Sequence, residues 1–103
     1  MTIAVNVAFQ GIDASDALRT DIENQAGKLE RFTETLQSCD AVVGREEGSH
    51  RHGNRFRVRV TATLPGGQET AEKLHEDAHV AAHQAFAALR RQLEDFVRIR
   101  RGD

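Results

Sequence analysis

The chain has 103 residues, of which 39% are hydrophobic, so it is expected to form one domain, residues 1–103, with a single modest core. Its formal net charge is −2, from 14 Lys and Arg against 16 Asp and Glu, so total charge does not indicate a nucleic-acid partner and only the distribution of the basic residues could. The one cysteine excludes an internal disulfide, and no apolar run is long enough for a membrane span or a signal peptide, which predicts a soluble cytoplasmic protein.

Two elements are predicted in the first third of the chain. Residues 3–9 alternate apolar and small polar side chains, which is typical of a strand with one buried face. Ser15 then has the position of a helix N-cap, with Asp16 in the first turn, and a helix is predicted over residues 16–32. The apolar stripe of this helix recurs at helical spacing and consists of Leu18, Ile22, Leu29 and Phe32.

The middle of the chain reads as two hairpins. A weaker strand over residues 39–43 is followed by a polar loop over 47–53. Residues 55–64, RFRVRVTATL, alternate strictly and predict the strongest strand. The next turn is predicted to place Gly66 and Gly67 at its tip, both at positive φ, which sets Thr61 opposite Glu72 in a fourth, edge strand over 68–74.

A second helix is predicted from Asp77, as N-cap or first residue, to about Arg98. The element order is therefore β-α-β-β-β-α, and the helical crossover predicts that the first strand lies parallel to a neighbour. Each strand offers only one apolar face, so both helices must cover the same side. We expect an α+β two-layer sandwich with a four-stranded mixed sheet and an open polar face.

Five motifs in this order resemble the ribosome hibernation promoting factors, a family that includes a ribosome-associated inhibitor also called sigma-54 modulation protein. The motifs are Asp16-Ala17-Leu18-Arg19, Gly27-Lys28-Leu29-Glu30-Arg31-Phe32, Pro65-Gly66-Gly67, His75-Glu76-Asp77 and Leu89-Arg90-Arg91-Gln92-Leu93. The resemblance implies a fold like the double-stranded-RNA-binding domain and binding to the decoding channel of the small ribosomal subunit (16S rRNA), which silences idle ribosomes. It further implies the short family form, without a linker and dimerisation domain, and a monomer off the ribosome.

Three groups of cations could bind rRNA phosphates, which require long basic side chains on a rigid face. The first two groups lie on the helices and in the C-terminal tail: Lys28, Arg31, Arg90, Arg91, Arg98, Arg100 and Arg101. The third consists of the strand arginines Arg55, Arg57 and Arg59. Hairpin pairing is expected to bring Glu46 to Arg55 and Glu72 close to Arg59, which would neutralise much of this third group. An ion-paired sheet face and an RNA contact both remain open for it.

The chain departs from the family pattern at several helix positions. The resemblance implies a tyrosine at Asp21, a lysine at Gln25, Met-Tyr at Ala78-His79, an Asp or Asn at His83 and a lysine at Ala88. His79 and His83 lie one turn apart and could share a zinc ion, but a closed site requires four ligands, and His50 and His52 lie on a distant loop. We therefore expect no metal and place His79 and His83 beside the RNA face.

No pattern in the chain indicates catalysis. There is no nucleophile elbow, paired-carboxylate motif or Gly-rich phosphate loop, and Cys39 is expected to be a small buried hydrophobe, so we expect no enzyme, cofactor or small-molecule substrate. The alternative function is a protein-interaction module that uses the exposed edge of the fourth strand. A basic helix face favours RNA, whereas a continuous apolar groove favours a protein partner.

Overall fold

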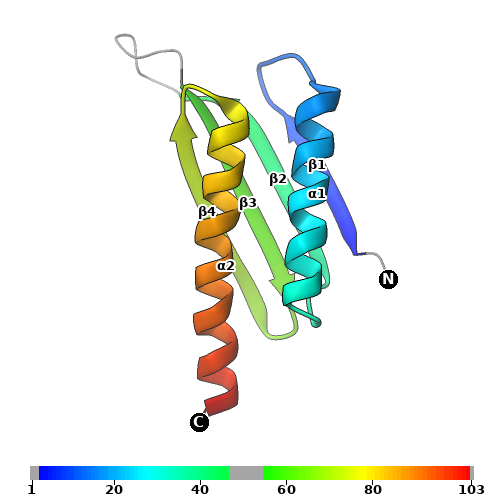
Figure 1. The fold of residues 1–103 in the computed structure, drawn as a ribbon, viewed down its shortest axis with the longest axis vertical. Helices are drawn as coiled ribbons and strands as arrows, with labels where there is room; N and C mark the ends of the chain where they lie inside the picture. Colours follow the sequence, from blue (N-terminus) through cyan, green and yellow to red (C-terminus); the bar gives the residue numbers. More distant parts are fainter. Residues whose placement is uncertain (1–2, 47–54, 103) are drawn as a thin grey trace.

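The computed structural model describes residues 3–46 and 55–102, and side chains up to residue 96. Its elements are β1 (Ala4–Phe9), α1 (Asp16–Phe32), β2 (Ser38–Arg45), β3 (Phe56–Leu64), β4 (Gly67–His75) and α2 (Ala78–Gly102), in the predicted order (Figure 1). The polar loop expected over 47–53, with His50 and His52, lies outside the described residues.

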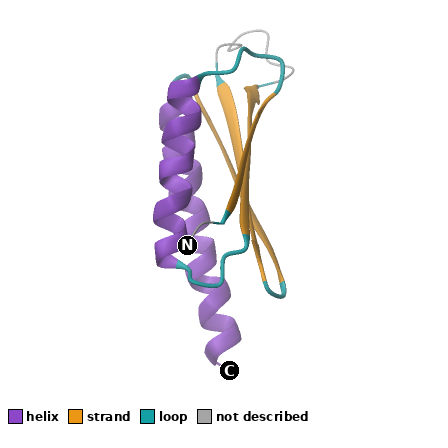
Figure 2. Ribbon diagram, turned by 90° about the vertical axis from the view of Figure 1, so that its right-hand side faces the viewer, coloured by secondary structure: helices purple, strands orange, loops and turns teal. Residues whose placement is uncertain are grey.

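The four strands form one sheet in the order β1-β2-β3-β4. β1 is parallel to β2, and the other two pairings are antiparallel, so the predicted mixed sheet, with β3 in its interior and β4 at an edge, is confirmed. Both helices lie on one face of the sheet, side by side and pointing the same way, and the other face is open (Figures 1 and 2). The predicted two-layer α+β sandwich is therefore correct.

Both helix starts follow from their capping residues. The Ser15 hydroxyl accepts a hydrogen bond from the Leu18 amide at 3.2 Å, and α1 has the predicted bounds. The Asp77 carboxylate accepts from the His79 amide at 2.8 Å and caps α2. The predicted end of α2 near Arg98 is wrong, because the helix continues to Gly102. No glycine or proline interrupts the segment before Gly102, so nothing there stops a helix that is already formed.

The core lies between the helices and the inner sheet face. Val58, Val60 and Ala62 are fully buried, as the alternation predicted, and they share one core with the apolar stripes of α1 and α2. Cys39 is also fully buried; burial, aided by the charge of Asp40, raises the pKa of its thiol to about 12. A thiol this protonated is unreactive, which agrees with its predicted role as a small hydrophobe.

The register of the β3–β4 hairpin differs from the prediction by two residues. Leu64 pairs with Gly67, so Pro65 and Gly66 form the tip, and Glu72 lies opposite Arg59 instead of Thr61. Proline followed by glycine at the two central positions is the sequence of a type II turn, in which only the second position needs positive φ. Accordingly, Gly66 has a φ of 95°, while Gly67 belongs to β4. A slip of two residues preserves the faces of a strand, so Ala71 is buried as predicted.

This turn predicts different effects for its two glycines. Gly66→Ala should destabilise the domain by about 1 kcal/mol, because positive φ is strained for an L-residue with a Cβ. Gly67→Ala is the matched control: its Cβ would meet the Phe96 ring at 3.7 Å, an ordinary contact, and stability should change by less than about 0.5 kcal/mol. Urea titrations of both variants measure the difference. Equal effects would contradict the turn geometry.

Candidate nucleic-acid interface

The open sheet face carries the strand arginines, and two of them are ion-paired. Arg55 Nε donates to Glu46 Oε1 at 2.7 Å, and Arg59 Nε donates to Glu72 Oε1 at 2.9 Å, so both predicted pairings are confirmed. The hydrogen bond to Glu46 raises the pKa of the Arg55 guanidinium, against a smaller opposing effect of desolvation. Arg57, between them on β3, lies opposite Gly44 and Leu74 and faces no acidic partner in the strand register.

The polar residues around these arginines also satisfy one another. Asn6 donates to Asp40 at 2.9 Å, the Thr61 and Thr70 hydroxyls are 3.0 Å apart, and Gln68 donates to Thr63 at 3.0 Å. Each of these bonds joins neighbouring strands. The face is therefore a lattice of cross-strand pairs in which positive and negative charges are largely matched.

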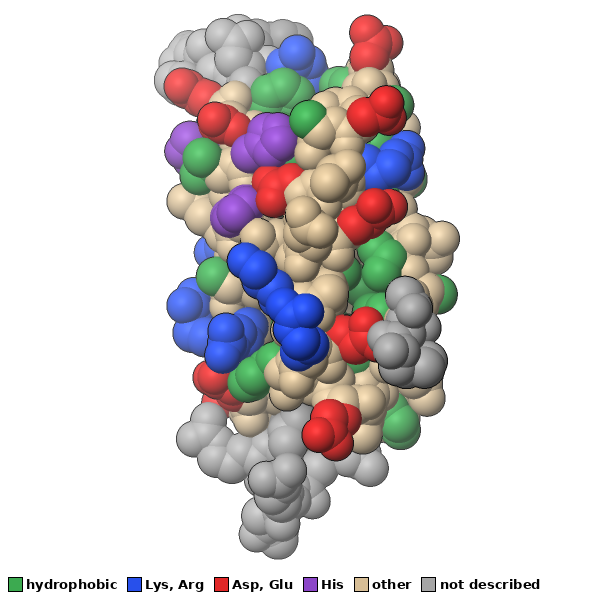
Figure 3. Space-filling model, turned by 45° about the vertical axis from the view of Figure 1, so that its right-hand side comes forward, with side chains coloured by type: hydrophobic (Ala, Val, Ile, Leu, Met, Phe, Trp, Pro, Cys, Tyr) green, Lys and Arg blue, Asp and Glu red, His purple; other side chains and the backbone are tan. Residues whose placement is uncertain are grey.

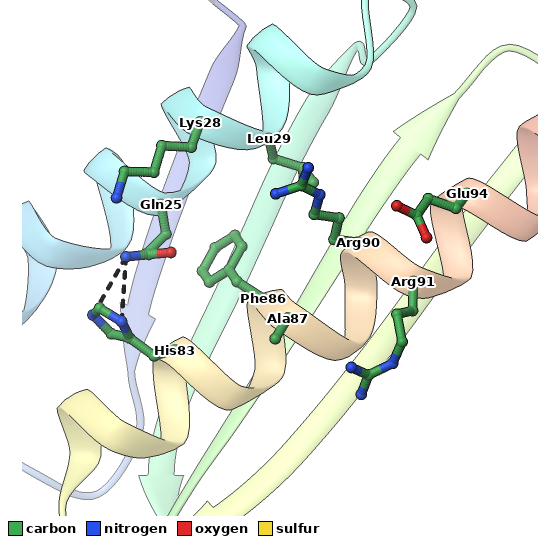
Figure 4. A pocket seen from close by; sticks show the side chains of 9 residues that line it. All are labelled: Gln25, Lys28, Leu29, His83, Phe86, Ala87, Arg90, Arg91 and Glu94. Carbon is green, nitrogen blue, oxygen red and sulfur yellow. Dashed lines mark hydrogen bonds between the residues drawn. The ribbon is translucent and has the colours of Figure 1, made fainter.

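A second polar surface lies over the groove between α1 and α2, which has a volume of about 470 Å³. Its floor is apolar, since Leu29 and Phe86 are almost completely buried. Its lining consists of Gln25, Lys28, Leu29, His83, Phe86, Ala87, Arg90, Arg91 and Glu94 (Figure 4). Three of these lining residues, Lys28, Arg90 and Arg91, are cations, and we call this groove the basic groove.

The two parallel helices bring Lys28 and Arg90 to the same groove from positions more than 60 residues apart in the sequence, and Arg91 lines its outer side (Figure 4). In Figure 4, Arg90 extends across the groove toward α1, Lys28 lies along α1, and Arg91 points away on the opposite side of α2. Arg31 is exposed on α1 and does not line the groove. Arg98, Arg100 and Arg101 belong to the last turns of α2, and their side chains lie outside the described part of the molecule.

Phe32 holds Arg90 in place. The prediction counted Phe32 in the buried stripe of α1, but the residue is 38% exposed at the end of the helix. The Arg90 guanidinium carbon lies 4.5 Å from the centroid of the Phe32 ring, within the range of a cation–π contact. Phe32 therefore does not belong to the buried stripe of α1, and its ring is covered in part by the Arg90 guanidinium instead of by the core.

The N-terminal half of the same groove carries a different chemistry. Asp21 of α1 lies between two histidines of α2: its carboxylate is 2.8 Å from His79 Nδ1 and 3.0 Å from His83 Nε2. The Gln25 amide nitrogen lies 3.3 Å from His83 Nε2. We call Asp21, His79 and His83 the Asp–His cluster. Figure 3 shows this face, with histidines around an acidic side chain above a gathering of Lys and Arg.

The cluster sets the charge state of its carboxylate. Partial burial raises the pKa of Asp21, but hydrogen bonds from His79 and His83 and their positive charges outweigh burial, and the pKa lies below its ordinary value of 3.8. Asp21 is therefore ionised at neutral pH.

The structure thus unites four of the departures from the family pattern. Asp21 and Gln25 are four residues apart on α1, and His79 and His83 are four apart on α2, so each pair presents one helix face. Ala88, another departure, packs partly buried against the core. Among residues 3–46 and 55–102, no group of three His, Cys, Asp or Glu side chains has the arrangement of a metal site, and the absence of metal binding stays a prediction.

Comparison with known proteins places this architecture among ribosome-associated proteins. The family model described as "Sigma 54 modulation protein / S30EA ribosomal protein" matches residues 5–101. A ribosome hibernation promoting factor of Azotobacter vinelandii is 27% identical over 89 residues, which cover 86% of this chain and 78% of that protein.

Two solved structures share the fold. A ribosomal subunit interface protein from Coxiella burnetii superposes with a TM-score of 0.79 at 18% identity, covering 91% of this chain and 97% of that one. The N-terminal domain of Thermus thermophilus Protein Y gives a TM-score of 0.76 at 21% identity, with coverages of 92% and 99%. No helix in the described part of the chain is long and apolar enough to cross a membrane.

Proposed function

The chain belongs to the sigma 54 modulation protein / S30EA ribosomal protein family, and we propose that it is a hibernation factor that binds the decoding channel of the small ribosomal subunit and silences idle ribosomes. In this role residues 1–103 act in the cytoplasm as one binding domain, monomeric off the ribosome. The protein would act by occupying this ribosomal site, without catalysis, a cofactor or a small-molecule substrate.

The basic groove is the observation that carries this proposal. A chain with net charge −2 gathers Lys28, Arg90 and Arg91 along one groove between two rigid helices. Helices present cations at fixed spacing, which favours contacts with successive phosphates of structured RNA. Such contacts recognise the shape of an RNA, as a site within the folded 16S rRNA requires. Arg31 and the tail arginines Arg98, Arg100 and Arg101 would extend the same footprint.

The ion pairs of the sheet arginines indirectly favour an rRNA footprint on the helices. Arg55 and Arg59 are committed to Glu46 and Glu72, so an RNA contact there would have to compete with existing ion pairs. We therefore assign the rRNA footprint to the helices and expect Arg57, of the three strand arginines, to be available on the open face.

A protein-interaction module is the second candidate, because no other strand of the described residues pairs with the outer edge of β4. Its side chains argue against it, since β4 is largely polar and exposed along its length. The α1–α2 groove has an apolar floor but cationic walls. This combination suits a phosphate backbone better than an apolar peptide.

Competition with the natural occupants of the decoding channel tests the proposed site. Purified small subunits are loaded with mRNA and tRNA and then titrated with the fluorescently labelled protein. We expect the apparent affinity to fall as mRNA and tRNA occupancy rises, and the protein in excess to prevent their loading. Simultaneous binding of all three would place the protein elsewhere on the subunit and contradict the decoding-channel assignment.

A further inference from the structure

The Asp–His cluster adjoins the basic groove without sharing its charge. His83 and Gln25 line the same groove as Lys28 and Arg90. The His79 and His83 side chains are 48% and 53% exposed, whereas that of Asp21 is only 21% exposed. A ligand lying along the groove would therefore meet the imidazoles first, with the carboxylate beneath them.

The charge of this half of the groove depends on the imidazoles. With both neutral, the cluster carries the single negative charge of Asp21 and repels phosphate; with both protonated, its net charge is positive. The charged groups around it are Asp21 and Lys28 from α1, Asp77 at the start of α2, and Arg90, Arg91 and Glu94 farther along α2. Glu94 lies toward the far end of the groove, so protonated imidazoles would join Lys28 and Arg90 into one cationic strip.

The hydrogen bonds within the Asp–His cluster leave one ring nitrogen of His79 free to contact a ligand. His79 uses Nδ1 toward Asp21, and its Nε2 has no hydrogen-bond partner among the described residues. Protonated His83 would carry a hydrogen on both ring nitrogens, and both lie within 3.4 Å of the Gln25 amide nitrogen. Two donors cannot bond each other, so the Gln25 amide must turn or release the ring. Protonation thus changes both the charge and the donor pattern of the surface.

We propose that the Asp–His cluster is a pH-dependent phosphate-binding site, which extends the basic groove along the RNA when His79 and His83 are protonated and opposes RNA when they are neutral. The inference rests on the proposed function, because rRNA is its occupant. Affinity for the small subunit should therefore be higher at pH 6.0 than at pH 8.0. Asp21 orients the two rings and places a negative charge beneath them.

If the Asp–His cluster only held the two helices together, we would not expect the same pH dependence of binding. The lowered pKa of Asp21 means that its carboxylate stabilises the fold above the ordinary value of 3.8, and this stabilisation is lost only as pH falls through the still lower pKa of the folded state. Titration of Asp21 therefore contributes nothing to a change between pH 8 and pH 6. Binding that changes in this window must come from other groups.

The test measures the affinity of the full chain for purified small subunits at pH 6.0 and 8.0, with magnesium and ionic strength constant. The parent should bind about three- to tenfold more tightly at pH 6.0, the effect of one or two charged contacts at an exposed surface. By analogy with B-DNA, the log–log salt dependence should be steeper at pH 6.0 by about 0.9 for each further phosphate that is neutralised. The double variant His79→Gln, His83→Gln should have the same affinity and salt slope at both pH values.

His75→Gln is the matched control, because His75 bonds the Asp77 amide at the end of β4 and does not line the groove; this variant should keep the parental pH dependence. Asp21→Asn gives a second readout if the double variant does not fold, and it should bind more tightly than the parent at pH 8.0. A pH dependence retained by the double variant, or Asp21→Asn no tighter than the parent, would overturn the site while leaving ribosome binding intact. No binding by the parent at either pH would overturn the proposed function itself.

Discussion

Replacing Val60 with aspartate is expected to destabilise the domain by about 3–5 kcal/mol, since the carboxylate would be buried without a partner. Val60 is fully buried in the interior strand β3, between Ala41 of β2 and Ala71 of β4, beneath the helices. Small domains have a total stability of only about 5–15 kcal/mol, so a substantial loss of folded protein should follow. Urea titration followed by circular dichroism measures the change.

Thr63→Asp is the matched control on the same strand. Thr63 lies on the open face, where it accepts a hydrogen bond from Gln68, and an aspartate could accept the same bond. We expect this variant to stay within about 1 kcal/mol of the parent, the range of strand propensities. A Val60→Asp protein that melts like the parent would place Val60 on the surface and contradict the two-layer fold.

Replacing both Arg90 and Arg91 with glutamate is expected to weaken small-subunit binding roughly 100-fold or more, because removing each charge-assisted hydrogen bond costs about 1.5–3 kcal/mol. The log–log salt slope should fall by about 0.9 for each phosphate that the variant no longer neutralises. Both side chains are exposed, so the melting transition should change little. Removing the Arg90 guanidinium from the Phe32 ring should cost only about 0.5–1 kcal/mol of stability.

Arg57→Glu reports on the other face with the same change of charge. If rRNA lies along the helices, this variant should bind small subunits nearly as well as the parent. A large loss of affinity for Arg57→Glu together with a small loss for the Arg90 and Arg91 variant would move the footprint to the open sheet face.

Local patterns predicted most of the fold. Strict alternation over 55–64 identified β3, and Ser15 and Asp77 marked the helix starts, because both signals act within a few residues. The β3–β4 register was predicted wrongly because Pro65-Gly66-Gly67 allows more than one choice of tip. Only the backbone φ angles show which tip the chain adopts, a type II turn in which Gly66 but not Gly67 has positive φ. The end of α2 was predicted too early, near Arg98, because no glycine or proline before Gly102 marks where the helix stops.

The candidate site was harder to predict because it joins two helices. Charge and spacing identified Lys28, Arg90 and Arg91 individually, but only the parallel packing of α1 and α2 shows that they line one groove. The contact of Asp21 with His79 and His83 was also missed. The signal was the four-residue spacing on both helices, yet which faces meet depends on how each helix rotates onto the sheet.

Sedimentation of the unmodified protein with separated small and large ribosomal subunits tests the central claim most directly. At low salt we expect the protein to pellet with small subunits in a saturable manner and to stay in the supernatant with large subunits. Raising the salt concentration should release it steeply, as phosphate contacts require. A protein that remains in the supernatant with small subunits at low salt, or pellets with them regardless of salt, would contradict an rRNA-binding hibernation factor.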